Sequence, residues 1–560
     1  MESYLTVILI AAGILLLTAL AILRTGAEEK KKLIARRHRT YGHINIRPVS
    51  SEALAARRQE SLAAGGPFGI DDITWHDLDG DRLYTAMNTC VSAPGESRLY
   101  DRLRRPAMDE DTLMPFVSLI DHYGSDETCR DALWLILSGI HFPKEGISVL
   151  RHLTEAAGIM TGPGLILAVL TAVSIAGLFI RPVPCLIAFI VLTGINIAWT
   201  LKDNTRTGPV CEALCFLRDM ITAGRKIAVL HAEDKTAAEA YQHIGRLASS
   251  LSPLLRGSAF IAVRSQATGG IGAAVMTYIN LFFHLDRLFL GRLAGLAVEK
   301  NEEIRALAAC LGDHDAAAAC ASYRLTLKKA CRAEFSSSPT EAGLWTEDLV
   351  HPFLENPVPN SAVLTGGTLM TGANASGKST FLKSCALAAW LAQTTGTAPA
   401  ASYRAPFFRI MTSMALKDDL TGGASYFVVE IRSIKRLLEA AKEEKPLLII
   451  IDEVLRGTNT IERIASSAQI LRAMVKPWTV VLAATHDREL TVLLRDVFRN
   501  RHFEEKLDAS GISFTYKLMD GPACATNALT LLSSEGYDKS IVDSAKIMAA
   551  RFEETGEWQI

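Results

Sequence analysis

The sequence has no excess of either charge and no closely spaced cysteine pairs, and these absences exclude several kinds of protein. Lysine and arginine number 59 against 60 aspartate and glutamate residues, so the formal net charge is -1. Such a chain has no overall attraction to nucleic acid, although a local basic groove is compatible with the total. The 10 cysteines form no Cys-x-x-Cys pair, which argues against a structural zinc site or a disulfide framework and favours a reducing compartment.

Long apolar runs are abundant. The chain has 560 residues, enough for two or three domains, and 49% of them are hydrophobic although 21% are charged. Residues 4–23 form an apolar run without any charged side chain. Roughly 20 helical residues cross a bilayer core, so this run predicts a transmembrane helix.

The charges that flank this run predict its orientation. Lysine and arginine residues follow it between positions 24 and 39, and none precedes it. The positive-inside rule therefore puts the N-terminus outside and the following residues in the cytoplasm. A cleaved signal peptide carries its charges before the apolar run, so we predict an uncleaved anchor at 1–24 and a basic linker at 25–73.

A second apolar region at 160–201 is interrupted by Arg181-Pro182-Val183-Pro184. Its halves, 160–180 and 184–201, are each about long enough to span a bilayer and would form a transmembrane hairpin. A helical hairpin buried inside a soluble domain is the alternative. A third run, 271–290, carries polar and charged residues and is more typical of a packing helix.

With three predicted spans, we expect a protein of the cell (inner) membrane whose N-terminus lies outside and whose residues 24–159 and 201–560 lie in the cytoplasm.

A phosphate-binding loop follows an apolar stretch that ends at Thr371. Its sequence matches G-x-x-x-x-G-K-[ST] between a predicted strand and a predicted helix, which is the context that this motif requires. Backbone N–H groups of such a loop surround phosphates, Lys378 would reach the β and γ phosphates, and Ser379 would bind Mg²⁺. The predicted nucleotide-binding residues are Gly372, Ala373, Asn374, Ala375, Ser376, Gly377, Lys378, Ser379 and Thr380.

Two further apolar stretches predict buried parallel strands that end in chemically active residues. Residues 446–451 lead into Asp452, which would hold Mg²⁺, and Glu453, which would polarise the attacking water. Residues 478–484 lead into Thr485-His486. Alone, an acidic pair after a strand is usually a solvated turn and such a histidine is usually a surface residue. The preceding phosphate loop makes catalytic roles for Glu453 and His486 the better interpretation.

These segments, in this order, resemble the ATPase domain of the MutS family, which belongs to the ABC superclass of ATPases. The segment at 418–430 resembles the MutS signature and differs from the L-S-G-G-Q segment of transporter ATPases. The matching blocks are HP at 351–352, PN at 359–360, TGANASGKST at 371–380, DDLTGGASYFVVE at 418–430, DEVLRGTNT at 452–460, ATH at 484–486, YKL at 516–518, and residues 536–545.

The resemblance implies a mechanism that two subunits share. In this superclass the signature segment of one subunit completes the ATP site of the other, so Ser425 would bond the γ-phosphate bound by its partner. A local helix-capping role is the alternative for Ser425. His486 would contact the γ-phosphate, and residues 458–460 would line the dimer contact. We therefore expect a homodimer that uses ATP and Mg²⁺.

A weaker resemblance extends upstream. Residues 74–106 look like the start of the MutS core or lever domain, and helices at 205–330 would supply the rest. The expected fold is an all-α lever domain at 74–340, interrupted by a transmembrane hairpin at 160–201, and an α/β ABC-type ATPase domain at 341–560.

This sequence departs from the family pattern in three ways. We expect no mismatch-reading domain before residue 74 and no nuclease-like domain at the C-terminus. A membrane hairpin interrupts the lever region. Pro357 stands near the place where many members have an aromatic residue that stacks on adenine.

Three functions are compatible with these features. The family resemblance favours a membrane-anchored ATPase that binds double-stranded DNA in a mismatch-repair-type process. The alternative is a membrane-tethered switch that acts on an unidentified protein partner without DNA. A transporter is disfavoured because the signature segment differs. The first reading rests on analogy, because no mismatch-reading site is found in the sequence.

Overall fold

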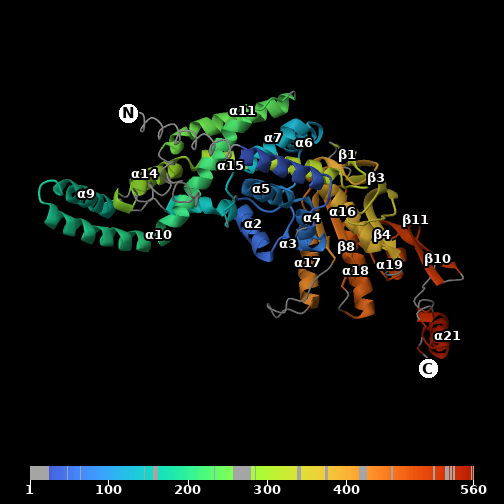
Figure 1. Ribbon diagram of the computed structural model, residues 1–560. Helices are drawn as coiled ribbons and strands as arrows, with labels where there is room; N and C mark the ends of the chain where they lie inside the picture. Colours follow the sequence, from blue (N-terminus) through green and yellow to red (C-terminus); the bar gives the residue numbers. More distant parts are fainter. Residues whose placement is uncertain are drawn as a thin grey trace. The chain divides into compact units, whose positions relative to one another are not determined.

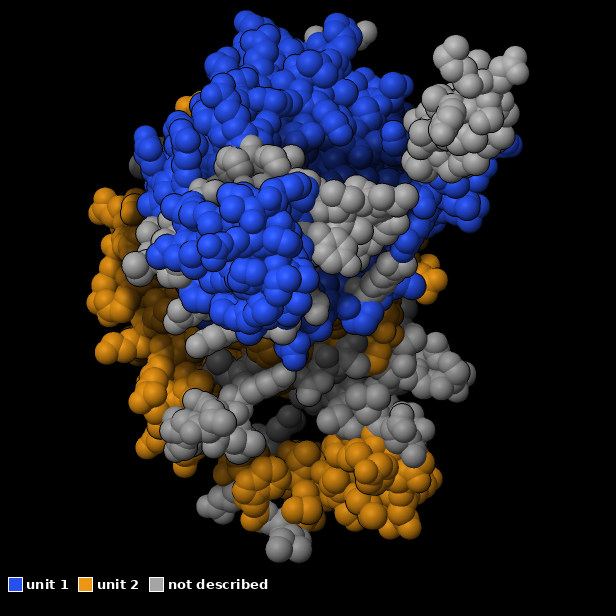
Figure 2. Space-filling view, turned by 60° about the vertical axis from the view of Figure 1, so that its left-hand side comes forward, with its two compact units in different colours: residues 1–66, 85–101, 116–325 blue, residues 67–84, 102–115, 326–560 orange. Residues whose placement is uncertain are grey.

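A computed structural model provides the structure of this protein, and its chain forms two compact units (Figure 2). Unit 1 comprises Met1–Gly66, Thr85–Asp101 and Phe116–Leu325, and unit 2 comprises Pro67–Tyr84, Arg102–Pro115 and Thr326–Ile560. The residues that the structure describes are 24–46, 48–63, 65–143, 145–155, 162–232, 234–256, 279, 281–283, 285–336, 342–372, 376–414, 426–455, 458–508, 511–523, 529, 532–533, 536–556 and 558.

The described part of unit 1 is helical, as the sequence predicted for the region before the ATPase. Residues 24–40 are helical as well. The elements that lie wholly in this unit are α2 (Ser51–Ala63), α7 (Glu127–Leu137), η1 (Gly146–Leu150), α8 (Arg151–Glu155), α9 (Gly162–Gly177), α10 (Pro182–Ile227), α11 (Lys235–Ser250), η3 (Ser252–Leu255), α14 (Leu285–Glu299) and α15 (Asn301–Arg324). The chain passes between the units within α4 (Gly80–Met87), α5 (Ala93–Arg104) and α6 (Glu110–Ser125).

Helices α9 and α10 lie side by side as a hairpin (Figure 1). Arg181 precedes α10, and a proline begins the helix, where its missing N–H leaves no hydrogen bond unmade. Inside the hairpin, the buried Asn196 amide donates to the Thr171 hydroxyl at 3.0 Å. The outward-facing side chains of this stretch are largely apolar and exposed.

Among the described residues, one helical segment is long and apolar enough to cross a membrane. It is Pro182–Thr200, with a mean hydropathy of 2.0 and 6% of its window buried. Helix α9 is apolar but shorter, with Gly164–Gly177 as its apolar part. The first predicted span, residues 4–23, lies outside the described residues. The structure therefore supports one of the three predicted spans by length and composition.

Unit 2 is built on a sheet with strand order β2-β6-β3-β4-β9-β8-β7, and β10 pairs with β4 and with β11. The sheet strands are β2 (Glu334–Phe335), β3 (Gly343–Leu349), β4 (Asn360–Thr371), β6 (Ser402–Ala405), β7 (Arg409–Ser413), β8 (Leu447–Asp452), β9 (Thr479–Ala484), β10 (Phe498–Asp508) and β11 (Gly511–Asp520). Two short strands, β1 (Cys331–Arg332) and β5 (Thr397–Ala398), pair separately.

The strands β10, β4, β9, β8 and β7 run parallel to their neighbours, which brings their carboxyl ends to one edge. Every residue of β9 is buried, and in β8 all residues before Asp452 are buried. Such uniformly apolar strands are typical of a parallel sheet covered on both faces. The predicted strands before Asp452 and before Thr485 are therefore confirmed.

The described part of unit 2 also contains helices α16 (Lys378–Thr395), α17 (Tyr426–Ala440), α18 (Thr460–Met474), α19 (Glu489–Leu493) and α21 (Lys539–Thr555). Leu437 of α17 and Leu471 of α18 share an apolar core with Ile449 of β8. Helix α16 carries Trp390, which is fully buried and donates to the Leu103 carbonyl at 2.9 Å. The C-terminal region thus has the α/β architecture expected of an ATPase domain.

Helix α3 (Asp72–Asp77), in the first segment of unit 2, is hydrogen-bonded to strand β7 and the residue after it. The buried Asp77 carboxylate accepts from the Thr412 hydroxyl at 2.7 Å and from the Met414 N–H at 2.9 Å. The sequence analysis assigned this stretch to the basic linker and the lever domain. Its packing shows that it also supports strand β7 of the sheet, while the predicted domain boundaries stay predictions.

Candidate functional site

The phosphate loop joins β4 to α16. Gly372 has φ of 131° and Gly377, the N-cap of α16, has φ of 104°, a backbone region that favours glycine. A Cβ on Gly377 would lie 3.2 Å from Cδ1 of Tyr516, so close packing also favours glycine there. Ala373, Asn374 and Ala375 lie outside the described residues. Thr380 lies in the first turn of α16.

The two groups predicted to bind Mg²⁺ meet directly. The Ser379 hydroxyl, in the first turn of α16, donates to Oδ2 of Asp452, at the end of β8, at 2.6 Å. An oxygen pair of a hydroxyl and a carboxylate is the ligand type that Mg²⁺ prefers. The buried Ser376 hydroxyl has no hydrogen-bond partner among the described residues, and the Lys378 ammonium donates to the Gly372 carbonyl at 2.5 Å. These polar groups fit a bound phosphate and its metal ion.

Glu453 and His486 also meet at this edge of the sheet. The Nε2 atom of His486 lies 2.9 Å from Oε1 of Glu453, and both side chains are partly exposed. The neighbouring strands set this separation, because the Glu453 N–H donates to the Ala484 carbonyl at 3.0 Å. Glu453 has φ of 61°, a left-handed conformation that costs about 1–3 kcal/mol and is common at functional sites.

A second ion pair lies beside the first. Arg463 of α18 contacts Asp487 with Nη2 at 2.6 Å from Oδ1 and Nε at 3.0 Å from Oδ2. Hydrogen bonding to Asp487 raises the pKa of the Arg463 guanidinium, and the Glu453 carboxylate contributes in the same direction. The sequence analysis missed this pair because 24 residues separate its members and no motif joins them.

Tyr516 of β11 is an aromatic residue at the phosphate loop that the sequence analysis did not single out as a ligand contact. It has φ of 55°, and its side chain is 45% exposed. The Asn360 amide at the start of β4 donates to its carbonyl at 3.0 Å, which fixes the backbone. The ring is therefore placed beside the loop, whereas Pro357 offers no aromatic face. Tyr516 is identified by its closeness to Gly377 in the fold, which the sequence did not reveal.

His351, from the segment that precedes the phosphate loop, carries no charge near neutral pH. Burial lowers its pKa to about 4, and the cations Lys383 and Arg82 act in the same direction. The ring centroids of Phe353 and His351 lie 5.8 Å apart, and the Arg82 guanidinium lies over the Phe353 ring, 4.6 Å from its centroid. This group packs the start of the predicted ATPase domain.

The predicted dimer segments are described in part. Asn459 caps α18, since its side chain accepts from the Ile461 N–H at 3.0 Å, and Thr458 and Thr460 flank it. Ser425, with the rest of 415–425, lies outside the described residues, as do Arg456 and Gly457. The role predicted for Ser425 therefore stays a prediction.

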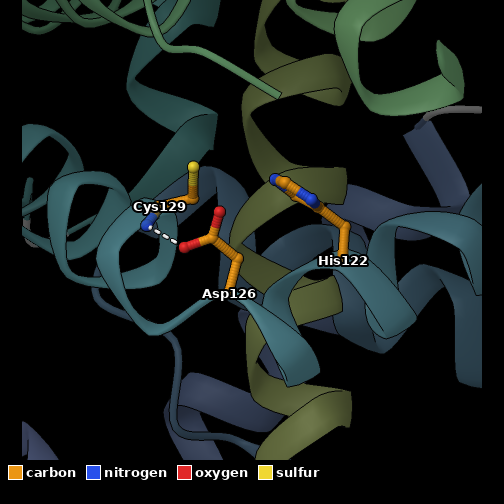
Figure 3. A group of neighbouring side chains, drawn as sticks. All are labelled: His122, Asp126 and Cys129. Carbon is orange, nitrogen blue, oxygen red and sulfur yellow. Dashed lines mark hydrogen bonds between the residues drawn. The ribbon is translucent and has the colours of Figure 1, made fainter. Parts of the chain in front are cut away.

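Unit 1 contains a separate cluster of His122, Asp126 and Cys129 (Figure 3). Their candidate ligand atoms lie within 4.8 Å of one another. Each has a partner inside the protein: Asp126 accepts from the Cys129 N–H at 2.9 Å, the thiol donates to the His231 carbonyl at 3.1 Å, and His122 bonds Tyr241 at 3.0 Å. Burial raises the pKa of the Cys129 thiol to about 11. We therefore interpret this cluster as packing between α6, α7 and α11.

About a third of the chain, towards its C-terminus, resembles known proteins. Residues 368–553 match the family model for MutS domain V. The chain is 35% identical over 212 residues to the DNA mismatch repair protein MutS of Thermus thermophilus, covering 36% of this chain and 26% of that protein. It is 32% identical over 211 residues to DNA mismatch repair protein MutS 2 of Haloarcula marismortui, covering 37% and 20%. The match with the first relative thus spans about a quarter of its length.

Proposed function

We propose that this chain is a MutS-type, membrane-anchored ATPase that binds and hydrolyses ATP at a dimer interface; the match of residues 368–553 to the model of MutS domain V supports this proposal. The observation that carries the ATPase assignment is the meeting of Ser379 with Asp452, and of Glu453 with His486, at the carboxyl ends of adjacent parallel strands. Ligands of open α/β sheets bind outside such strand ends.

Each residue has a defined task in this mechanism. Lys378 would exchange the Gly372 carbonyl for phosphate oxygens, and Ser379 and Asp452 would hold Mg²⁺, which would neutralise charge on the phosphates. Glu453 orients the attacking water and accepts its proton. His486, whose Nε2 lies 2.9 Å from Oε1 of Glu453, would contact the γ-phosphate.

The Tyr516 ring would stack on the nucleotide base. Its position against Gly377 and its exposure make a π-face available next to the phosphate loop. Stacking of a base on an aromatic side chain contributes about 1–3 kcal/mol. Tyr516 would thereby supply the aromatic contact that Pro357 does not.

A second subunit would cover the site. Helix α17 begins within the signature segment and exposes Val428 and Ile431, and Ile461 is exposed two residues after the capping Asn459. Exposed large apolar side chains around an ATP site favour a partner surface. In this homodimer Ser425 would bond the γ-phosphate held by the other chain.

The hairpin of α9 and α10 would anchor the protein in the cell (inner) membrane. Its outward side chains include exposed Ile166, Val173, Val183 and Ile190, which suit lipid better than water. The helix at 24–40 exposes the lysines at 30–32 close to the predicted N-terminal span, which favours a cytoplasmic position for this helix and for the ATPase domain. The N-terminus would then lie outside.

The process that the ATPase serves is proposed from family membership. Its relatives are named DNA mismatch repair proteins, so double-stranded DNA is the first candidate partner, held between helical levers by its backbone. A protein partner at the membrane is the second candidate. The balanced net charge and the exposed apolar hairpin favour this second role.

ATP turnover by the detergent-solubilised chain, with and without duplex DNA at low and physiological salt, tests the proposal. Glu453→Gln is the catalytic control. Turnover that duplex DNA stimulates, more strongly at low salt, and that Glu453→Gln abolishes would support a DNA-responsive ATPase. Turnover that Glu453→Gln abolishes but DNA leaves unchanged would favour the protein-directed role. Absence of turnover in the parent chain would refute hydrolysis.

A further inference from the structure

We propose that Arg463 and Asp487 are positioning residues that hold His486 against Glu453 and connect it to the segment predicted to line the dimer contact. The inference rests on the proposed ATPase function and adds a regulatory connection to it. A partner subunit that presses on residues 458–460 would move α18, and Arg463 would pass this displacement to the loop that carries His486.

The Arg463–Asp487 ion pair is bidentate, so it fixes the orientation of the two side chains as well as their separation. Two nitrogens of the Arg463 guanidinium bind the two oxygens of Asp487, at 2.6 and 3.0 Å. Such forked contacts are more specific than contacts with a single charged atom. The side chains are 24% and 15% exposed, so solvent weakens this pair less than an ordinary surface ion pair.

The Asp487 end of the pair is anchored near the site by hydrogen bonds of the backbone. The Asp487 N–H donates to the Thr485 hydroxyl at 3.0 Å, and the Thr485 N–H donates to the Met370 carbonyl of β4 at 3.0 Å. His486 therefore lies between two restrained residues. Asp487 adds a side-chain connection from this loop to α18.

The other end begins at the predicted dimer segment. The Arg463 N–H donates to the Asn459 carbonyl at 2.8 Å, in the first turn of α18. A shift of Asn459 would therefore move Arg463 with it.

The same helix supplies a matched control. Arg472 makes a forked contact with Asp496, with Nη2 at 2.9 Å from Oδ1. This second pair also joins α18 to residues that follow β9, but it lies near the C-terminal end of the helix and is more exposed, at 38% and 56%. Arg472→Ala removes a comparable contact without touching the groups around His486.

The test compares Arg463→Ala, Asp487→Ala, the exchanged pair Arg463→Asp with Asp487→Arg, and Arg472→Ala in the full detergent-solubilised chain. We expect each single change at the first pair to lower kcat about tenfold or more, with KM for ATP nearly unchanged, because misplaced catalytic groups slow the reaction step. The exchanged pair should restore part of kcat. Arg472→Ala should keep the parent rate.

Amide hydrogen exchange in residues 485–489, which Arg472 does not contact, provides a readout that does not depend on turnover. Faster exchange there in Arg463→Ala than in Arg472→Ala would support the positioning role, even if the parent chain failed to hydrolyse ATP and so refuted the proposed function. Equal exchange in the two variants would overturn the inference. Equal kcat in the two variants, in a parent chain that does hydrolyse ATP, would overturn it as well.

Discussion

Strand β8 of unit 2 and the first part of α10 in unit 1 are both long apolar runs, yet their surroundings are opposite. The strand residues 447–451 are fully buried by neighbouring strands and helices. In Pro182–Thr200 only 6% of the helical window is buried. An apolar run shows that a segment avoids water, but the surrounding elements decide whether protein or lipid replaces the water.

Substituting an aspartate into each run should have the most different effects on the stability of the ATPase domain. Ile450→Asp puts a charge at a site that is 0% exposed, whereas Ile190→Asp puts one at a site that is 61% exposed. An unpaired buried carboxylate should cost about 4 kcal/mol or more and remove the folded ATPase domain. Thermal unfolding and ATP binding of the purified chain would measure this loss.

Ile190→Asp should leave ATP binding and unfolding of the ATPase domain unchanged and should weaken insertion of the hairpin into lipid vesicles. Flotation of the protein with vesicles on a density gradient would measure insertion. Equal destabilisation of the ATPase domain by both substitutions would show that the hairpin is covered by protein and would contradict the lipid environment.

The second prediction concerns the polar end of β8. Asp452→Asn should lower the maximal ATP turnover about 100-fold, because a neutral amide holds Mg²⁺ less tightly than a carboxylate does. The apolar strand before it is unchanged, so the unfolding temperature should stay near that of the parent. Turnover measured against Mg²⁺ concentration checks this, and an unchanged Mg²⁺ dependence would remove Asp452 from the metal site.

The sequence predicted those features of unit 2 that are local along the chain. Uniform apolar runs predicted β8 and β9, and therefore that Asp452, Glu453 and His486 lie at or just after the ends of these strands, while the catalytic roles of these residues stay predictions. The helical hairpin was also predicted from composition, but α10 continues through Pro209 to Ile227, beyond the predicted end at 201. Packing of the last part of α10 against α11 and α15 stabilises this continuation.

Features that depend on contacts between distant residues were not predicted. The Arg463–Asp487 pair, the position of Tyr516 beside Gly377 and the attachment of Asp77 to β7 all join residues far apart in sequence. Periodicity and motifs describe neighbours along the chain, so they contain no information about such contacts. Sheet order, which brings β11 next to the phosphate loop through β10 and β4, decides where these side chains meet.

Tyr516 offers a third prediction, which concerns binding affinity. Tyr516→Asn should weaken ATP binding about tenfold, because it removes the stacking ring while asparagine accepts the left-handed backbone. Tyr516→Phe keeps the ring and should bind like the parent. Calorimetric titration with ATP and with tripolyphosphate distinguishes base stacking, since only ATP binding should respond. An equal loss for both ligands would instead indicate a distorted phosphate loop.

The smallest expected effect concerns the buried polar groups of unit 1, whose interior differs from the apolar core around β8. His314 and Asp315 are adjacent on α15 and both are buried. Burial lowers the pKa of His314 from 6.5 to about 4 and raises that of Asp315 from 3.8 to about 6. Tyr123 bonds the imidazole at 2.7 Å, and the Ser92 hydroxyl bonds the carboxylate at 2.5 Å.

These two shifts act on stability in opposite directions as the pH falls. The unfolded chain protonates His314 more readily, so its contribution is present above pH 6.5 and is lost towards pH 4. The folded chain protonates Asp315 more readily, so its contribution is present below pH 3.8 and is lost as the pH rises through about 6. Between about pH 4 and 6 the two contributions largely cancel in the parent chain.

Removing either group should therefore expose the contribution of the other. Asp315→Asn should make the unfolding temperature of unit 1 fall more steeply on acidification from pH 6 to pH 4 than it does in the parent, because only His314 then titrates. His314→Gln should make it fall less steeply, because only Asp315 then titrates. Thermal unfolding followed at several pH values checks both slopes, and parallel curves for the three proteins would show that neither group is perturbed in the fold.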